Sequence, residues 1–346
     1  MDAARQRQAA TRRRRWSRGV AGAALALAAC LAGCSPRAAQ PPPAGSGEPV
    51  SLRFGWPPGM QAQVLTQASR QRVIGSDTRE GATTTSYALA VHADADGVLV
   101  QTFDVRAQVR SDGVSPQQQA LLEFVTRASA SLPVLLVAPS GQVLGLRGVA
   151  EMRRELLAAM TPLLTGPAEQ TETMRQSFES LFAEERLSGV VTALWTPIVG
   201  AWSGADLVIG ETYEGADQQP SPLVPGMPIT MAYKYRVMRR LPCTAGATAL
   251  ACVEIRLISR PSDEALPAIR ASMQQLFSMN APRGATMPEI DDLEVKNSLT
   301  LITEPATLRP HRLVQERSIS GIVEQGDQPD VAVRQTERAE TTWTYR

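Results

Sequence analysis

Hydrophobic and polar residues alternate along most of the chain after residue 50, which is the period of a β-strand. The first runs with this pattern lie at 61–74, 82–92 and 98–110. Their β-branched residues and the turn residues between them favour antiparallel strands with one solvated face. Further strands are predicted at 206–213, 229–241, 248–259, 293–304, 312–324 and 331–345.

Two of these strands differ in character. The strand at 229–241 alternates strictly, so Tyr233 and Tyr235 are expected on one apolar face. The closing strand at 331–345 alternates charged and small residues, which predicts a solvated strand or an edge strand. A shorter pair at 132–138 and 142–146 predicts a hairpin around a Pro-Ser-Gly turn.

A helical insert is predicted at about 149–203, where the apolar spacing changes to three or four residues. Its last part, 187–205, carries no charged residue after Leu187 until Asp206 and includes Trp195 and Trp202. A membrane span is one interpretation of this stretch. Pro197 and several glycines interrupt it, so a buried helix that breaks near Pro197 is the preferred interpretation.

These elements together predict an α+β fold. We expect a curved antiparallel sheet, similar to a half-barrel, packed with a layer of helices. The sheet is either continuous or divided into two lobes. The body of the protein is expected to span residues 50–346, which is long enough to bury a sizeable core.

The N-terminal segment has a different composition. A basic stretch from Arg12 to Arg18 precedes an uncharged stretch from Val20 to Ala32, which is too short to span a bilayer. The segment ends in Leu31-Ala32-Gly33-Cys34 and resembles a bacterial lipoprotein export signal with its lipobox. The alternative is an ordinary secretory signal in which the cysteine stands by chance.

The lipoprotein resemblance implies that residues 1–33 are removed and that Cys34 carries the lipid that attaches the protein to a membrane. Residues 34–49 are rich in proline and predict an extended tether. Ser35, in place of an aspartate, resembles the sorting pattern for the outer membrane. The expected location is therefore the outer membrane, with the body facing the periplasm.

Charge excludes one class of partner. Without residues 1–33 the chain keeps 28 of its 35 basic residues and 33 of its 34 acidic residues, a formal charge of −5. The clustered cations that nucleic acid binding requires are lost with the signal segment. We therefore expect no nucleic acid partner.

Cys243 and Cys252 remain in the mature chain beside Cys34, and they stand between two predicted strands. In an oxidising compartment a disulfide across the hairpin is the expected outcome, contributing about 2–3 kcal/mol. Two free thiols or half of a metal site are the alternatives. The sequence has no CxxC motif and no nearby histidine, which disfavours the metal site.

Catalytic and metal-binding motifs are nearly missing from the sequence. His92 and His311 stand far apart, each without a companion at ligand spacing, and both are expected on strand surfaces. The Asp-Gly pair at 96–97 predicts a hairpin turn in preference to a calcium loop. Neither GxSxG nor SxxK occurs. We therefore expect no catalytic residues, no metal and no cofactor.

The body resembles uncharacterised β-rich periplasmic lipoproteins in two short motifs, Val137–Val143 and Val208–Tyr213. The order of its elements is similar to the lipoprotein-carrier (LolA-like) architecture. That architecture implies a half-barrel with helices across its open side and an apolar cavity between them. Neither family supplies catalytic residues.

The leading hypothesis is a non-enzymatic, membrane-tethered protein that binds an apolar ligand, such as a lipid or acyl chain, between sheet and helices. The predicted lining is Trp195, Trp202, Tyr233 and Tyr235; the competing interpretation is that these rings fill the core. A second hypothesis is a cell-envelope scaffold that docks a protein partner. A hydrolase with an unidentified nucleophile is the third.

Overall fold

The computed structural model describes residues 47–114, 119, 122–124, 126, 132–161, 168–220, 228–271, 274, 289–325 and 328–346. Its strands are β1 (Pro49–Ser51), β2 (Gln61–Ile74), β3 (Asp77–Asp94), β4 (Gly97–Ser111), β5 (Val134–Val137), β6 (Val143–Arg147), β7 (Asp206–Val208), β8 (Thr212–Pro220), β9 (Pro228–Leu241), β10 (Cys252–Pro261), β11 (Glu289–Thr303), β12 (Pro310–Gln325) and β13 (Gln328–Tyr345). Its labelled helices are α3 (Val149–Met160), α4 (Ala168–Leu181), α5 (Glu184–Trp195) and the π-helix η3 (Thr196–Gly200).

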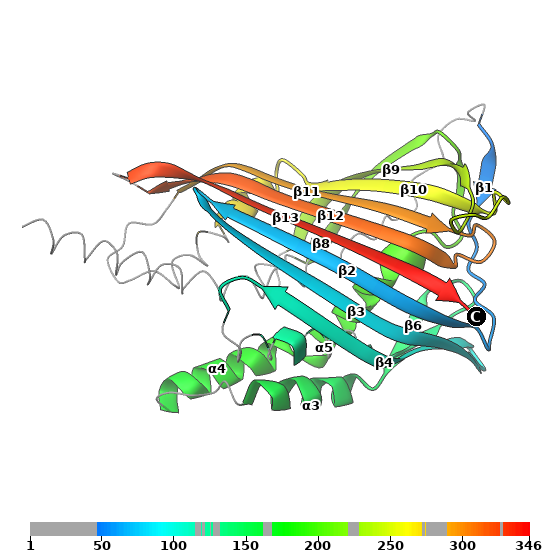
Figure 1. Ribbon diagram of the computed structural model, residues 1–346, viewed down its shortest axis with the longest axis horizontal. Helices are drawn as coiled ribbons and strands as arrows, with labels where there is room; N and C mark the ends of the chain where they lie inside the picture. The colour runs from blue at the N-terminus through cyan, green and yellow to red at the C-terminus, as the bar shows by residue number, and fades with distance from the viewer. Residues whose placement is uncertain are drawn as a thin grey trace, which may run out of the picture.

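One antiparallel sheet of eleven strands dominates the fold (Figure 1). Its strand order is β6-β5-β4-β3-β2-β13-β12-β11-β10-β9-β8, so strands that follow each other in the chain pair from β2 to β6 and from β8 to β13, and β2 meets β13 at the junction of these two runs. That junction joins the first long strand to the last over an unbroken register, from Ala62 opposite Tyr345 to Ile74 opposite Val333. The two halves of the chain therefore form one continuous sheet.

The prediction of an α+β fold with a layer of helices is wrong. The described chain is mostly β, and its few helices do not form a layer over the sheet. The long strands, several of them 14 to 18 residues, curl the sheet by their twist, so the sheet itself encloses most of the core. A helical layer is needed only where a sheet leaves its apolar face open.

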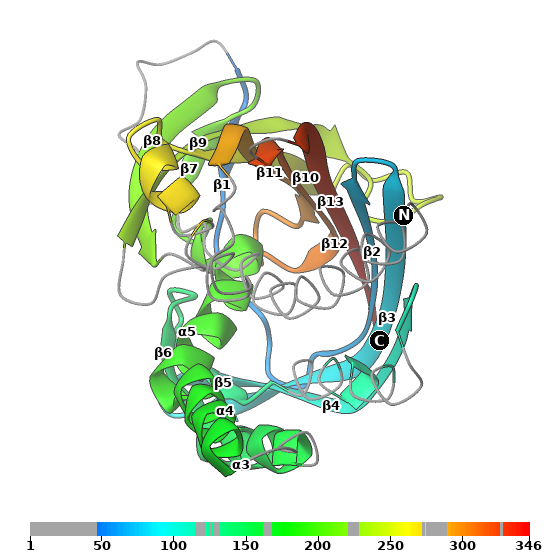
Figure 2. The same cartoon turned by 90° about the vertical axis from the view of Figure 1, so that its left-hand side faces the viewer.

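The two edges of the curled sheet approach each other on the side where α5 lies (Figure 2). Helix α5 continues without interruption into η3, and Pro197 occupies the start of the π-helical turn. A proline at this point removes one backbone donor, and the wider turn accommodates its ring. The break expected near Pro197 is therefore a change of helix type. Among the described residues, no helix is long and apolar enough to cross a bilayer.

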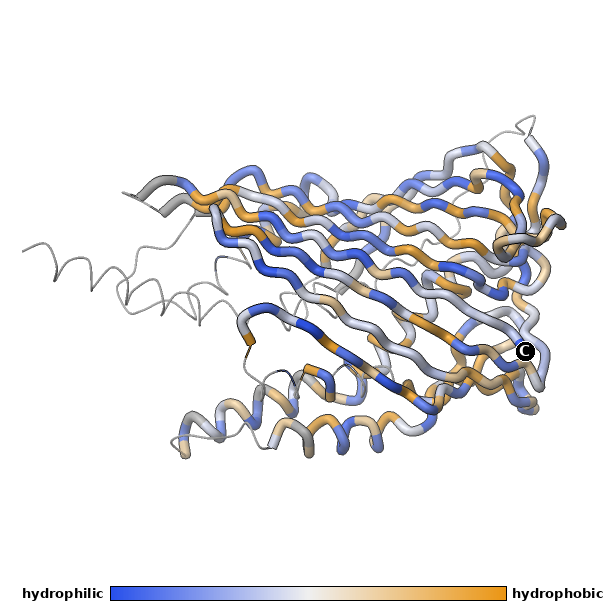
Figure 3. Tube along the Cα trace, in the orientation of Figure 1, coloured by the Kyte–Doolittle hydropathy of each residue, from blue (hydrophilic) through white to orange (hydrophobic). Residues whose placement is uncertain are grey.

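The main apolar core lies at the end of the sheet where β2 begins and β13 ends, and a smaller apolar cluster that includes Ile229 and Ile290 lies at the opposite end. Val64 and Trp343 stand opposite each other in the main core, and both are buried. We call the face that carries these two side chains the inner face. Hydrophobic and hydrophilic residues alternate along the long strands (Figure 3), so the outer face is largely polar. Farther along the same strands the inner face becomes polar as well.

Of the two alternatives for the closing strand, the edge strand is wrong, whereas its outward side chains are solvated, with Arg338 50% exposed. Strand β13 lies between β2 and β12 in the middle of the sheet. Its outward charges pair with neighbouring strands: Arg338 contacts Glu316 of β12 at 2.6 Å, and Glu340 accepts from Arg312 of β12 at 2.8 Å. A central position therefore suits a strand of charged and small residues, because neighbouring strands supply partners for the charges.

Candidate functional site

The predicted lipid-attachment residue, Cys34, lies outside the described residues, together with the signal segment and nearly all of the tether. Its modification stays a prediction. The described chain begins at Gly47, two residues before β1. Strand β1 pairs with β7 through Val50 opposite Leu207, which fixes the start of the body beside the end of the helical segment.

The four aromatic residues predicted to line a ligand site are all buried in the main core. Trp202 lies with its ring centroid 5.6 Å from that of Tyr235 in an edge-to-face contact, and Tyr235 lies 6.3 Å from Tyr233. Trp195 instead packs edge-on against Trp56 at 5.1 Å. The structure thus brings three of the four together and places Trp195 in a neighbouring aromatic group.

These tryptophans join the two edges of the curled sheet. The Nε1–H of Trp195 donates to the carbonyl of Gly141, in the β5–β6 turn, at 2.8 Å. Trp202 follows η3 and donates its Nε1–H to the carbonyl of Pro197 at 2.8 Å. Its ring packs on Tyr235 of β9, the strand next to the other edge strand, β8. Both indole donors are therefore satisfied within the protein. The contacts agree with a structural role in closing the sheet.

A disulfide joins Cys243 and Cys252, as predicted, with the two Cα atoms 5.0 Å apart. It closes the loop between β9 and β10. The loop residues 244–251 are exposed, whereas Cys252 is fully buried. The disulfide therefore connects a solvent-facing loop to the apolar core.

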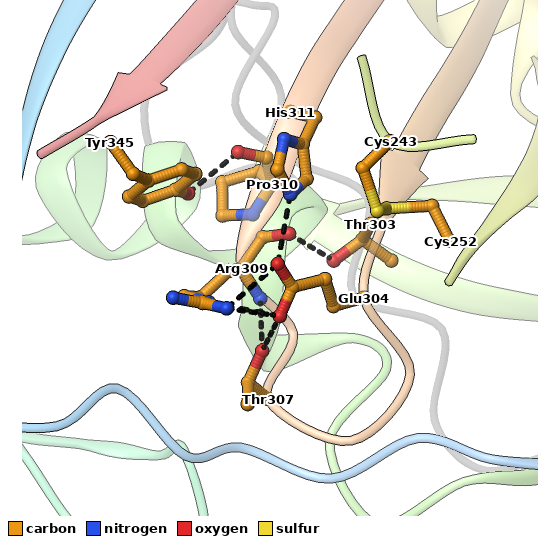
Figure 4. Close-up of a disulfide and its surroundings, with 9 residues drawn as sticks. All are labelled: Cys243, Cys252, Thr303, Glu304, Thr307, Arg309, Pro310, His311 and Tyr345. Atoms are coloured by element: carbon orange, nitrogen blue, oxygen red, sulfur yellow. Dashed lines mark hydrogen bonds and ion pairs between the residues drawn. A yellow bond between two sulfur atoms is a disulfide. The ribbon is translucent and has the colours of Figure 1, made fainter. Parts of the chain in front are cut away.

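A hydrogen-bonded network lies beside this disulfide, in the loop between β11 and β12 (Figure 4). The carboxylate of Glu304 accepts from both Nε and Nη2 of Arg309, at 2.9 and 2.7 Å, and from the Thr307 hydroxyl at 2.9 Å. His311 Nε2 lies 3.0 Å from the second carboxylate oxygen. Tyr345 stacks edge-on against His311, with ring centroids 5.2 Å apart. The carboxylate is thus the centre of the network.

This network shifts the pKa of two groups. Burial opposes ionisation of Glu304 and is the largest single influence, but the hydrogen bonds from His311, Arg309 and Thr307 and the charge of Arg309 outweigh it. The pKa of Glu304 is therefore below its ordinary value. Burial also raises the pKa of Tyr345. Glu304 is ionised and Tyr345 neutral at pH 7, so with Glu304 ionised the ring of His311 donates through Nε2.

The lowered pKa of Glu304 predicts a pH-dependent contribution to stability. A carboxyl group with a depressed folded-state pKa stabilises the fold above its unfolded value, near 4.5, and this stabilisation is lost as pH falls through the folded pKa. We expect Glu304→Gln to lower the free energy of unfolding by about 1–3 kcal/mol at pH 7. Urea denaturation between pH 3 and 7 should show the difference from wild type shrinking below about pH 4.

The matched control for this prediction is Glu316→Gln. Glu316 is half exposed and pairs with Arg338 on the outer face, so its loss should cost less than about 1 kcal/mol. A difference between Glu304→Gln and wild type that does not change with pH would contradict the ionised state of Glu304.

A second group of polar residues lies on the inner face, away from the aromatic core. Arg70 and Arg72 share this face of β2 with Val64, because side chains alternate along a strand without a bulge. Arg79 of β3 stands directly opposite Arg72. We call Arg70, Arg72 and Arg79 the arginine layer. Burial, and then the charges of Arg70 and Arg79, lower the pKa of Arg72.

Few acids balance this layer. Asp77 contacts Arg79 at 3.3 Å. Glu337 stands opposite Arg70 on β13, and its carboxylate accepts from the amide of Gln335 at 2.8 Å. Like charges directly opposite each other in a sheet are destabilising, so the Arg72–Arg79 pair is retained at a cost.

The outer face carries a groove of about 800 Å³ that crosses β4, β3, β2, β13, β12 and β11. Most of its lining side chains belong to the outer face, with small residues such as Ser69 and Ser318 between charged ones. Acidic and basic residues are nearly balanced along it, from Arg110 and Asp112 at one side to Lys296 at the other. The groove therefore shows no preference for the charge of an occupant.

One set of described residues has the chemistry of a metal site. Cys243, Cys252 and His311 each offer a ligand atom within 4.8 Å of the others. The expectation that His311 lies on a strand surface is wrong, since its side chain is only 10% exposed, whereas His92 is exposed as expected. The sequence did not indicate this set because β10 and β11 separate His311 from Cys252 along the chain.

Comparison with protein-family models finds no matching family, and comparison with curated proteins finds no relative. The site is therefore interpreted from its own residues.

Proposed function

We propose that this chain is a lipid-anchored, non-enzymatic protein of the bacterial cell envelope that binds an anionic amphiphile on the inner face of its sheet. The anchor is the lipid on Cys34, and the body faces the periplasm from the outer membrane. The arginine layer is the observation that carries the proposal. It supports a ligand with an anionic headgroup, a narrower class than the apolar ligand that the sequence suggested.

The charge of the layer supports an anionic ligand. Arg72 stands opposite Arg79 and two positions from Arg70 on one strand. Asp77 contacts Arg79 and Glu337 stands opposite Arg70, so the described acids beside the layer number two against three arginines. A carboxylate or phosphate between such guanidinium groups removes their mutual repulsion and accepts paired hydrogen bonds from them. A stabilising anion is the simplest reason for keeping three arginines on an inner face.

The residues beside the layer support an apolar tail. Between the arginine layer and the aromatic core, the inner face of β2, β3, β4 and β13 carries mostly threonine and alanine side chains, beside Val109. They are Thr66, Ala68, Thr83, Thr85, Ala107, Ala339 and Thr341. Such side chains extend only a short way from the sheet, so an acyl chain can lie close to the backbone over them. The headgroup then meets the layer and the tail points toward the core.

The test uses a fluorescent fatty acid and its methyl ester as paired probes, titrated into the purified protein. We expect the Arg70→Gln/Arg72→Gln variant to bind the fatty acid at least tenfold more weakly, since a charged hydrogen bond contributes about 1.5–3 kcal/mol. The methyl ester has no negative charge, so its affinity should change little.

The control is Arg106→Gln/Arg110→Gln, which removes the same charge from exposed positions on the outer face of β4. It should leave both affinities near the wild-type values. Wild-type protein that binds neither probe, or equal losses for acid and ester, would contradict the proposal. Protein that copurifies with a stoichiometric protein partner and no lipid would favour the envelope scaffold.

A further inference from the structure

The disulfide and His311 form a compact cluster at the start of β12 (Figure 4). The cluster combines two elements that are distant in the chain: the β9–β10 loop supplies the cysteines, and β12 supplies the histidine. A ring nitrogen of His311 and the two Sγ atoms lie within 4.8 Å of one another. Two thiols and an imidazole at such distances are a typical donor set for zinc.

His311 has an unsatisfied nitrogen in this cluster. Its side chain is nine-tenths buried, and Nε2 lies 3.0 Å from Glu304. Nδ1 is buried, and no described residue forms a hydrogen bond with it. A buried polar atom left unpaired costs about 1–3 kcal/mol. In native proteins such an atom often marks an ion or a functional role.

We propose that reduction of the Cys243–Cys252 disulfide converts this cluster into a Zn²⁺ site, with both thiolates and the imidazole of His311 as ligands. Three protein ligands leave the fourth tetrahedral position open to water or to a further ligand. Soft thiolates together with imidazole favour Zn²⁺ over Mg²⁺ or Ca²⁺. Glu304 is a positioning residue, because a carboxylate bonded to the imidazole orients the ring.

The chemistry balances with a dithiol as the reductant. A thiolate of the dithiol attacks Cys243, the more exposed sulfur, and releases Cys252 as a thiolate. The second thiol then displaces Cys243, so the dithiol becomes a disulfide and the protein gains two electrons and two protons. Binding of Zn²⁺ to the two thiols and the neutral imidazole releases two protons. The 5.0 Å separation of the Cα atoms keeps the thiols near each other after reduction.

The experiment adds Co²⁺, as a spectroscopic substitute for Zn²⁺, to the reduced and the oxidised full chain. In the reduced protein we expect one equivalent of Co²⁺ to bind, with sulfur-to-cobalt charge-transfer bands and the visible bands of a tetrahedral site. Zn²⁺ should displace it. The oxidised protein should show none of these bands, because its sulfurs are bonded to each other.

Variants identify the third ligand. His311→Ala should weaken Co²⁺ binding about a hundredfold or more, whereas His92→Ala, an exposed histidine on β3, should leave it unchanged. Glu304→Gln should lower the affinity about tenfold to a hundredfold with the same absorption bands, and Glu304→Asp should restore part of it.

Several outcomes would overturn the proposal. One is binding by His311→Ala that equals wild type, which would mean adventitious binding to two thiols. Another is equal binding by the oxidised protein. The third is a reduced chain that circular dichroism shows to be unfolded both with and without Zn²⁺. Such a chain has no preformed metal site.

Discussion

The Trp202→Ala variant is expected to unfold with a free energy about 3–5 kcal/mol below that of wild type, measured by urea denaturation. Trp202 is 1% exposed and is among the largest fully buried side chains in the protein. Its loss removes the contact with Tyr235 and the hydrogen bond to Pro197, and it leaves a cavity where the helical segment meets β9. The two edges of the curled sheet should separate more readily as a result.

This prediction distinguishes a core residue from a ligand-lining residue. The control is Leu194→Ala on α5, where the side chain is 38% exposed and its loss should change stability by less than about 1 kcal/mol. If Trp202→Ala kept wild-type stability and lost only affinity for the fatty acid probe, the ring would be lining a ligand site. The structural role inferred from its contacts would then be wrong.

The period of the sequence predicts individual strands well in this protein. The run at 61–74 coincides with β2, and the hairpin expected around Pro139 forms between β5 and β6. These elements depend on local pattern and turn residues, which the sequence contains directly. The disulfide could be predicted equally well, because the two cysteines stand close together in the chain and at the ends of paired strands.

The global arrangement could not be obtained in the same way. The alternation of residue types along β13 indicates that the strand has two different faces. It does not indicate which strands lie beside it. Its pairing with β2 joins segments from opposite ends of the chain and makes the sheet continuous. Because of this pairing, β13 is a central strand and not the predicted edge strand. The predicted α+β fold class was wrong for the same reason. The curvature that encloses the core is a property of the assembled sheet and not of any single strand.

The candidate sites depend on register, which explains why sequence analysis missed them. Arg72 and Arg79 become opposite neighbours only through the pairing of β2 with β3. His311 reaches the cysteines only because β11 and β12 return the chain to the start of β10. A search limited to short ligand spacings detects neither group. The four aromatic residues could be selected from the sequence by their size and apolar neighbours. These properties do not distinguish a core residue from a residue that lines a binding site.

Gly97, the first residue of β4, is a position where a single added methyl group should strongly disrupt the packing of β5 against β4. Its φ of +154° is rarely adopted by other residues. A Cβ built there would lie 2.1 Å from the carbonyl oxygen of Val137, which is backbone and fully buried. The absence of a side chain at Gly97 therefore allows β5 to approach the β3–β4 hairpin.

We expect Gly97→Ala to lower the free energy of unfolding by about 3–5 kcal/mol, measured by urea denaturation. The control is Gly113→Ala, where φ is +72° but no atom lies within 4 Å of the added Cβ, so the cost should be only about 1–2 kcal/mol. The difference between the two variants measures the clash with β5 apart from the backbone strain. Hydrogen exchange should also increase first in β5 and β6, because these strands must move to admit the methyl group. Equal losses of unfolding free energy in the two variants would mean that β5 moves to admit the methyl group at no energetic cost. The close approach of β5 to Gly97 would then not contribute to stability.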